Sequence, residues 1–314
     1  MIGKLRLAIT AGVVLALVTC PLWGGASARS VLVLFAYHAA LAQMWNLLAG
    51  YAGLVTFGQQ VFVGLGGFTL AVGCERLGLG VWPAFGLAAI VAAALAVPIG
   101  ALTFRLKGGY FAAGSWLVAE VVRLLFGTWA FVGSGSGMFV RRARSVDPWL
   151  TYYVAIALLI GMVALIIVLL RSRPGLALMA IRDSEEAAAS LGVHVWRVKL
   201  FAFVLAAAGT ALVSALITIQ TPFIQPNAAF SIQWSAAASF MAVVGGLGTV
   251  EGPLLGAAVY VILQERLGAT GPVHMIVLGA VSVIVMLVEP RGLAGVMRAR
   301  LGWTWFPIVR RPPR

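Results

Sequence analysis

The chain has 314 residues, of which 62% are hydrophobic and only 10% are charged. A soluble domain usually has about a quarter of its residues charged, so this composition excludes an ordinary soluble protein and indicates an integral membrane protein. The 22 basic and nine acidic residues give a net charge of +13. Because the basic residues stand at the ends of apolar segments, the charge follows membrane topology and argues against a nucleic-acid partner.

Apolar blocks follow one another along the whole chain, separated by Gly, Pro and Arg. Blocks of this length can cross a bilayer, and lipid favours helices because a helix satisfies its own backbone hydrogen bonds. The sequence therefore predicts an all-α polytopic membrane protein, a single domain over 1–314 with a bundle of about 8–10 transmembrane helices. The predicted segments are 7–22, 30–49, 54–73, 82–104, 110–128, 150–170, 200–220, 229–247, 252–265 and 272–289.

The first block has two interpretations. Lys4 and Arg6, the apolar run that follows them, and the Ala26-Ser27-Ala28 sequence resemble a cleavable signal peptide. A first transmembrane helix that stays attached fits the same residues, and we favour it because a polytopic protein needs such helices.

Two blocks depart from a straight crossing. Block 54–73 is interrupted by glycines, and block 252–265 is short and follows a second group of glycines. Each is expected to form a re-entrant or discontinuous helix. Transporters build a path at the membrane midplane from such segments in two halves of the chain, although close packing of helices explains the glycines equally well.

Amide side chains accompany these glycines. Gln43, Asn46, Gln59 and Gln60 could hydrogen-bond a small zwitterion or amide, or could join helices to one another. The residues that we assign to a translocation path or to helix packing are Asn46, Gly58, Gln59, Gln60, Gly64, Gly245, Gly246, Gly248, Gly252 and Gly256.

Few charged residues fall inside the apolar blocks. Glu120 and Arg123 are three residues apart on one predicted helix, so they can pair on one face and lower the cost of each charge in lipid. We predict an intramembrane ion pair, with the lining of a path or contact with a partner subunit as the functional alternative.

Residues 171–199 form the only long polar segment and hold five of the 22 basic and three of the nine acidic residues. The pattern around Glu186-Ala187-Ala188 is helical, and Gly192 is placed where a helix would end. A membrane protein that concentrates its polarity in one cytoplasmic helix is expected to present that helix to another protein. A solvated connecting loop is the alternative.

The basic residues also predict the orientation in the membrane. With ten crossings and cytoplasmic N- and C-termini, fifteen basic residues lie inside, including those of a basic tail over 291–314, and six lie outside, as the positive-inside rule requires. Arg141, Arg142 and Arg144 are the discordant cluster on the outer side. They could be a local exception to the rule, a docking patch for an acidic partner, or a sign that one crossing is miscounted.

Catalytic and metal-binding patterns are missing from the sequence. His38, His194 and His274 have no metal-ligand spacing, and Cys20 and Cys74 require no disulfide. No G-x-x-x-x-G-K-[ST] phosphate-binding loop occurs. We therefore expect a protein that is not an enzyme and that has no cofactor or metal of its own, so that any ATP would be bound by another polypeptide.

Four blocks resemble a known family, the permease subunits of branched-chain amino acid ABC importers, and specifically their LivM-type subunit. They are Asn46–Leu54 running into Phe57–Gly66, Leu106–Ala113, Arg173–Lys199 and Val244–Ala257. The blocks occur in the family's order and span most of the chain. The Arg-rich run at Arg141–Arg144 is a departure from the family.

The resemblance implies a transport subunit of a bacterial cytoplasmic (inner) membrane importer for branched-chain amino acids or related solutes such as amides or urea. Its implied partners are a homologous LivH-type permease, two cytoplasmic P-loop ATPases that bind ATP and Mg, a solute-binding protein outside the cytoplasm, and the lipid bilayer. Glu186-Ala187-Ala188 with Gly192 resembles the EAA-type coupling helix that docks on the ATPases, and Arg182 belongs to the same block. The rival interpretation is a self-sufficient secondary transporter or channel.

Overall fold

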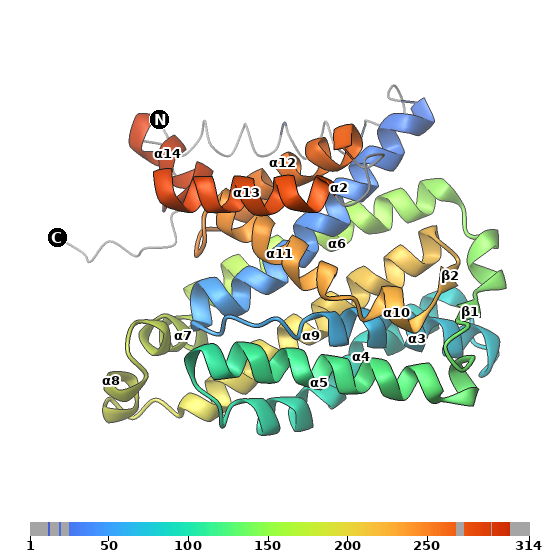
Figure 1. Ribbon diagram of the computed structural model, residues 1–314, viewed down its shortest axis with the longest axis horizontal. Coiled ribbons are helices and arrows are strands. Elements are labelled where there is room, and N and C mark those ends of the chain that lie inside the picture. The colour runs from blue at the N-terminus through green and yellow to red at the C-terminus, as the bar shows by residue number, and fades with distance from the viewer. Residues whose placement is uncertain (1–11, 13–18, 20–24, 268–272, 290, 302–314) are drawn as a thin grey trace.

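The computed structural model describes residues 12, 19, 25–267, 273–289 and 291–301 (Figure 1). The predicted first crossing, 7–22, therefore falls almost entirely outside the described residues. The elements in chain order are α2 (Gly25–Asn46), the π-helical turn η1 (Leu47–Tyr51), α3 (Gln60–Glu75), α4 (Val81–Thr103), α5 (Gly108–Thr128), the 3₁₀ turn η2 (Ala130–Val132), β1 (Met138–Phe139), the 3₁₀ turn η3 (Arg141–Ser145), α6 (Pro148–Arg171), α7 (Arg173–Asp183), α8 (Glu185–Ser190), α9 (Val195–Gln220), β2 (Phe223–Ile224), α10 (Pro226–Ala229), α11 (Ile232–Gly245), α12 (Glu251–Leu267), α13 (Val273–Val288) and α14 (Gly292–Leu301).

The prediction of an all-α polytopic membrane protein is confirmed. Within the described ranges, seven stretches are long and apolar enough to cross a membrane, and α3 is a shorter apolar helix. The seven stretches are Gly25–Tyr51, Val81–Thr103, Gly108–Thr128, Pro148–Arg171, Val195–Gln220, Pro226–Gly245 and Ile276–Ala299. The last of them runs from α13 into α14 across residue 290, which lies outside the described residues.

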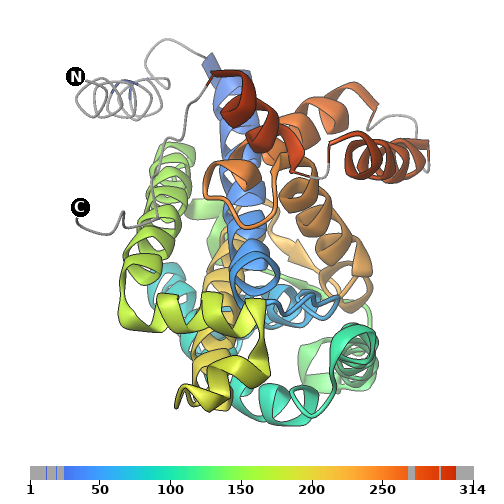
Figure 2. The ribbon, with the colours of Figure 1, turned by 90° about the vertical axis from the view of Figure 1, so that its left-hand side faces the viewer.

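The bundle has two distinct ends (Figure 1). At the strand end, β1 pairs antiparallel with β2, with Met138 opposite Ile224. The turn between α3 and α4 belongs to this end, because Arg142 donates a hydrogen bond to the Leu79 carbonyl at 2.6 Å. At the opposite end, α7 and α8 connect α6 to α9, and Figure 2 looks onto this α7–α8 end.

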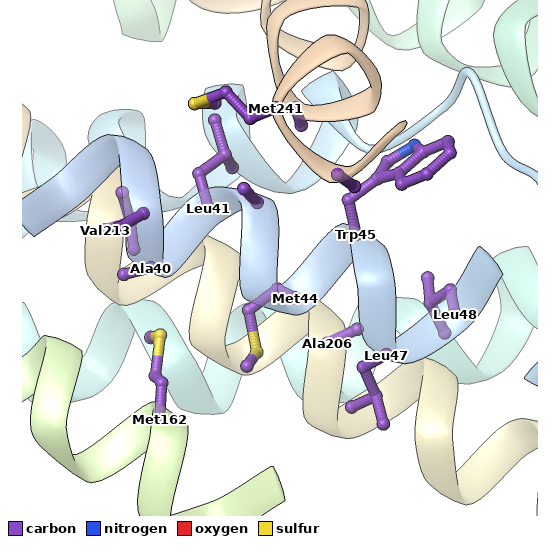
Figure 3. Close-up of a cluster of buried hydrophobic side chains, with 14 of the residues drawn as sticks. Ala40, Leu41, Met44, Trp45, Leu47, Leu48, Met162, Ala206, Val213 and Met241 are labelled. Atoms are coloured by element: carbon purple, nitrogen blue, oxygen red, sulfur yellow. The ribbon is translucent and has the colours of Figure 1, made fainter. Parts of the chain in front are cut away.

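Helix α2 runs through the centre of the bundle. Figure 3 shows Leu41 facing Met241 of α11 and Met44 facing Met162 of α6, with Ala206 of α9 on the same side of α2 as Met44. All five side chains are buried. Because other helices rather than lipid surround α2, polar side chains on α2 can form hydrogen bonds with those neighbouring helices.

Helix α4 packs through small residues. Ala84, Ala88, Ala92 and Ala96 are buried at four-residue spacing, whereas Ile90 on another face is 66% exposed. Small residues let backbones approach closely, and exposed aliphatic side chains suit a lipid-facing surface. The helix therefore has one packed face and one face of membrane character.

The third predicted crossing is discontinuous, as the sequence predicts. Helix α3 has 16 residues, about 24 Å at 1.5 Å per residue, which is shorter than a hydrocarbon core of roughly 30 Å. Residues 53–58 precede it without helical structure. Trp45 Nε1 donates to the Thr56 carbonyl at 2.9 Å, so this stretch finds its hydrogen-bond partners inside the protein.

The second break lies between α11 and α12. Helix α11 ends at Gly245, and α12 begins at Glu251 with 17 residues, about 25 Å in length. Residue Gly292 at the start of α14 lies against the backbone of Gly246. The first part of the predicted tail is therefore a helix that packs on this break, and residues 302–314 lie outside the described ranges.

Candidate functional site

Helix α8 is a short, well-capped helix at the α7–α8 end. The Ser184 hydroxyl accepts a hydrogen bond from the Ala187 N–H at 3.2 Å, and Glu185 and Glu186 occupy the first turn, where the helix dipole favours acidic groups. Gly192 follows the C-cap with φ of +82°, and the Val193 N–H donates to the Ala188 carbonyl at 3.1 Å. This is a Schellman ending, which needs the left-handed conformation that glycine adopts readily.

The outer face of α8 makes few contacts with the rest of the chain. Glu186 and Ala187 are exposed, whereas Ala188 is buried and holds the helix to the bundle. Leu191 is 82% exposed, although it is a large apolar residue. The sequence did not predict the exposure of Leu191, because that exposure depends on how α8 packs. Lys199 of α9 pairs with Glu185 at 2.5 Å, so α8 is tied to α9.

Arg182 links the α7–α8 end to the first break. Its Nη1 donates to the Gly50 carbonyl at 3.1 Å, and its Nε and Nη2 bind Asp183 at 3.0 and 2.9 Å. Gly50 lies in the π-helical turn η1, where the hydrogen-bond ladder of α2 changes pitch. The polar segment is thus joined directly to the first glycine-broken region.

The two breaks also meet each other. Asn46 Oδ1 accepts from the Gly248 N–H at 2.8 Å, and Asn46 Nδ2 donates to the Thr249 carbonyl at 2.9 Å. Gln43, one turn earlier, donates to the Val250 carbonyl at 2.7 Å. Two buried amides of α2 therefore hold the α11–α12 turn. A side chain on Gly248 would also approach Arg182 Nη1, so Arg182, Gly50 and Gly248 form one junction.

The other glycines of the second half lie where α11 and α12 approach closely. A Cβ atom on Gly245 would overlap the carbonyl oxygen of Gly252, and one on Gly252 would overlap that of Gly246. A Cβ atom on Gly256 would overlap the carbonyl oxygen of Met241. The backbones of the two helices are therefore in direct contact at these positions.

The residues predicted in the third block make similar contacts. Gly58 lies against the backbone of Ser115 in α5, and Gly64 lies against the ring of Phe230. Gln59 donates to Thr210 Oγ1 of α9 at 2.7 Å, and Gln60 accepts a hydrogen bond from the Ser235 hydroxyl of α11. These residues join helices to one another.

Glu120 and Arg123 lie apart from the junction. They form an ion pair on α5, in which Arg123 Nε donates to Glu120 Oε2 at 2.9 Å, and Arg123 Nη1 also binds Asn227 of α10. The pair therefore ties α5 to the segment after β2, near the strand end. Within the described ranges, no group of three or more His, Cys, Asp and Glu side chains is arranged to hold a metal ion.

Gly256→Ala is expected to lower the thermal unfolding midpoint of the detergent-purified protein, because the added methyl would push α12 away from Met241. Overpacking of this kind typically costs about 1–3 kcal/mol. Gly127→Ala is the matched control, since nothing lies within 4 Å of its Cβ position in α5. Equal midpoints for the two variants would contradict the close α11–α12 contact.

The structure is that of a multi-pass helical membrane protein. Its two glycine-broken segments meet through Asn46, and Arg182 joins the α7–α8 end to them. The chain belongs to the family described as branched-chain amino acid transport system / permease component, whose model matches residues 27–286. This is a family of transport subunits rather than enzymes.

Curated relatives agree with this assignment. The chain is 29% identical over 286 residues to the LivM permease protein of the high-affinity branched-chain amino acid transport system of Escherichia coli K12, and equally to that of Salmonella typhimurium LT2. The match covers 82% of this chain and 67% of each relative. The ribose import permease protein RbsC of Bacillus subtilis is 30% identical over 142 residues, 43% of this chain and 44% of that protein. No solved structure matches.

Proposed function

We propose that this chain is the transmembrane permease subunit of an ATP-driven importer for branched-chain amino acids or related small solutes such as amides or urea. Its α8 helix docks on a separate ATPase, and its bundle forms part of the translocation path. The names of its relatives and its family description support the solute class.

The observation that carries the proposal is the junction of Arg182 with Gly50 and Gly248. A force applied to α7 and α8 by a partner would reach both glycine-broken segments through this one side chain and through Asn46. An element that is joined to two breaks can bias a two-state change in the bundle. Leu191 and Glu186 supply an exposed surface for the partner.

The orientation follows from the same proposal. The α7–α8 end is cytoplasmic, in a bacterial inner membrane, and the strand end faces outward. The partners are a homologous LivH-type permease, two cytoplasmic P-loop ATPases that bind ATP and Mg, and a solute-binding protein at the strand end.

The test is uptake of radiolabelled L-leucine by the complex reconstituted in proteoliposomes. Uptake that requires ATP, and that persists when ion gradients are collapsed, is expected. Uptake that continues without ATP but stops when the ion gradient is collapsed would replace the proposal with the secondary-transporter interpretation.

The arginines of η3 give a prediction for the strand end. Arg142 donates to the Leu79 carbonyl, and the Arg144 guanidinium lies 4.6 Å from the centroid of the Phe139 ring. The backbone N–H of Arg141 donates to the Glu75 carboxylate, and the Arg141 side chain is exposed. Replacing all three by Gln is expected to weaken uptake several-fold, and most strongly at low salt, if they attract an acidic binding protein. Uptake that matches the wild type at 20 mM and 500 mM salt would exclude this role.

A further inference from the structure

A pocket of about 510 Å³ opens between α2, α10, α11 and α12, on the strand-end side of the junction. Its lining includes Tyr37 and His38 of α2, Trp234 of α11, and Tyr260 and Gln264 of α12. None of the glycines assigned to a translocation path or to helix packing lines this pocket. The pocket is therefore a separate feature from the coupling junction.

Aromatic rings form one wall of the pocket. The His38 ring centroid lies 4.4 Å from that of Tyr37, 4.8 Å from that of Tyr260 and 6.5 Å from that of Trp234. The indole of Trp234 is fixed, because its Nε1 donates to the Ala228 carbonyl at 3.0 Å. A set of rings held in this way offers an apolar surface that needs little reorganisation when a ligand binds.

Two polar groups in the pocket lack a full set of protein partners. Gln264 Oε1 is buried and has no hydrogen-bond partner among the described residues. His38 Nδ1 lies 2.9 Å from the Leu34 carbonyl, which can only accept, so Nδ1 carries the hydrogen and Nε2 of the neutral ring is an acceptor. Both atoms can accept a hydrogen bond from an N–H or O–H donor.

The pocket has no charged lining among the described residues. The polar members of the lining are hydroxyl, imidazole and amide groups, with Gln225, Asn227 and Gln233 at its exposed side. A solute with a net charge would lose hydration here without a counter-charge, which is costly. A solute without net charge matches the pocket if it has N–H donors for the polar acceptors and an apolar part for the aromatic wall.

We propose that this pocket binds a small net-neutral solute of the neutral amino acid and amide class, as a station on the route across the membrane. This proposal deepens the importer function and rests on it for the direction of transport. Gln264 and His38 accept hydrogen bonds from the solute, and Trp234 and Tyr260 contact its apolar part.

The test is equilibrium binding of radiolabelled L-leucine to the full chain in nanodiscs, with unlabelled acetamide, L-glutamate and L-arginine as competitors. Acetamide is expected to compete, whereas the two charged amino acids do not. Gln264→Leu is expected to weaken binding by about tenfold or more, the size of one hydrogen bond lost to a buried group.

A second variant tests the same pocket independently, in case Gln264→Leu does not fold. Ala228→Phe places a ring in the pocket from an exposed residue and leaves the carbonyl bond to Trp234 in place. It is also expected to weaken L-leucine binding about tenfold or more. Ala94→Phe on the exposed face of α4 is the matched control and should bind like the wild type.

Any of three results would overturn the pocket assignment. Both pocket variants could bind L-leucine like the wild type, the wild-type chain could fail to bind L-leucine, or the charged amino acids could compete as well as acetamide. ATP-driven uptake in proteoliposomes separates this failure from that of the importer proposal. If uptake requires ATP and Gln264→Leu leaves the KM for L-leucine unchanged, the pocket assignment is wrong and the importer proposal stands. If the pocket variants lose L-leucine binding but uptake by the complex does not depend on ATP, the importer proposal is wrong and the pocket assignment stands.

Discussion

Glu186→Lys is expected to abolish ATP-driven uptake while membrane insertion and the thermal unfolding midpoint stay close to those of the wild type. Glu186 is exposed on α8, and its backbone carbonyl accepts a hydrogen bond from the Ser190 hydroxyl at 3.0 Å. The substitution places a positive charge where the surface proposed to dock on the ATPase has a negative one. An ATPase surface that complements Glu186 would repel the lysine, which lowers the affinity between the two subunits. Uptake assays in proteoliposomes and co-purification of the ATPase check both parts of this prediction.

Gly192→Pro tests the same helix through its backbone. Proline fixes φ near −65°, whereas Gly192 has φ of +82° and donates its N–H to the Ala189 carbonyl at 3.0 Å. Gly78→Pro is the matched control, because Gly78 has φ of +69° and open space around it, but lies in the turn after α3 at the strand end. Loss of ATPase binding in Gly192→Pro alone is expected. Wild-type uptake by Gly192→Pro would remove the coupling assignment.

Arg182→Ala is expected to uncouple the transporter, so that ATP hydrolysis by the assembled complex continues while L-leucine uptake falls about tenfold or more. The substitution removes the hydrogen bond to the Gly50 carbonyl and leaves α8 unchanged. Parallel measurement of phosphate release and uptake in one proteoliposome preparation checks the ratio.

Two controls accompany this prediction. Arg173→Ala removes an exposed arginine from the first turn of the same helix and should keep the wild-type ratio of uptake to hydrolysis. Arg182→Lys keeps the charge but loses the planar fork that binds Asp183 and Gly50 together, so an intermediate ratio is expected. An unchanged ratio in Arg182→Ala would mean that force reaches the bundle elsewhere, for example through Lys199 and Glu185.

Local patterns in the sequence predicted the local structure well. Glycine next to a short helical run predicted the end of α8, because only the left-handed φ at Gly192 allows that ending. The glycines in block 54–73 predicted a discontinuous crossing, and residues 53–58 are indeed non-helical. The division of the polar segment into α7 and α8 at Ser184 was not predicted.

Contacts between distant parts of the chain could not be predicted in this way. Asn46 was chosen from its polarity within an apolar run, but its partners Gly248 and Thr249 lie about 200 residues away, and nothing local identifies them. Gly64 was assigned to a translocation path or to helix packing, but the sequence could not show that its lack of a side chain makes room for the ring of Phe230. The pocket joins His38 to Gln264, so it depends on the packing of α2 against α12.

The most direct test of the importer proposal is gentle affinity purification of this chain from its native membrane, with mass spectrometry of the proteins that accompany it. The proposal predicts recovery of P-loop ATPases and a second, similar permease, and loss of the ATPases in Glu186→Lys. Recovery of this chain alone, in a form that transports L-leucine after reconstitution without ATP, would contradict it.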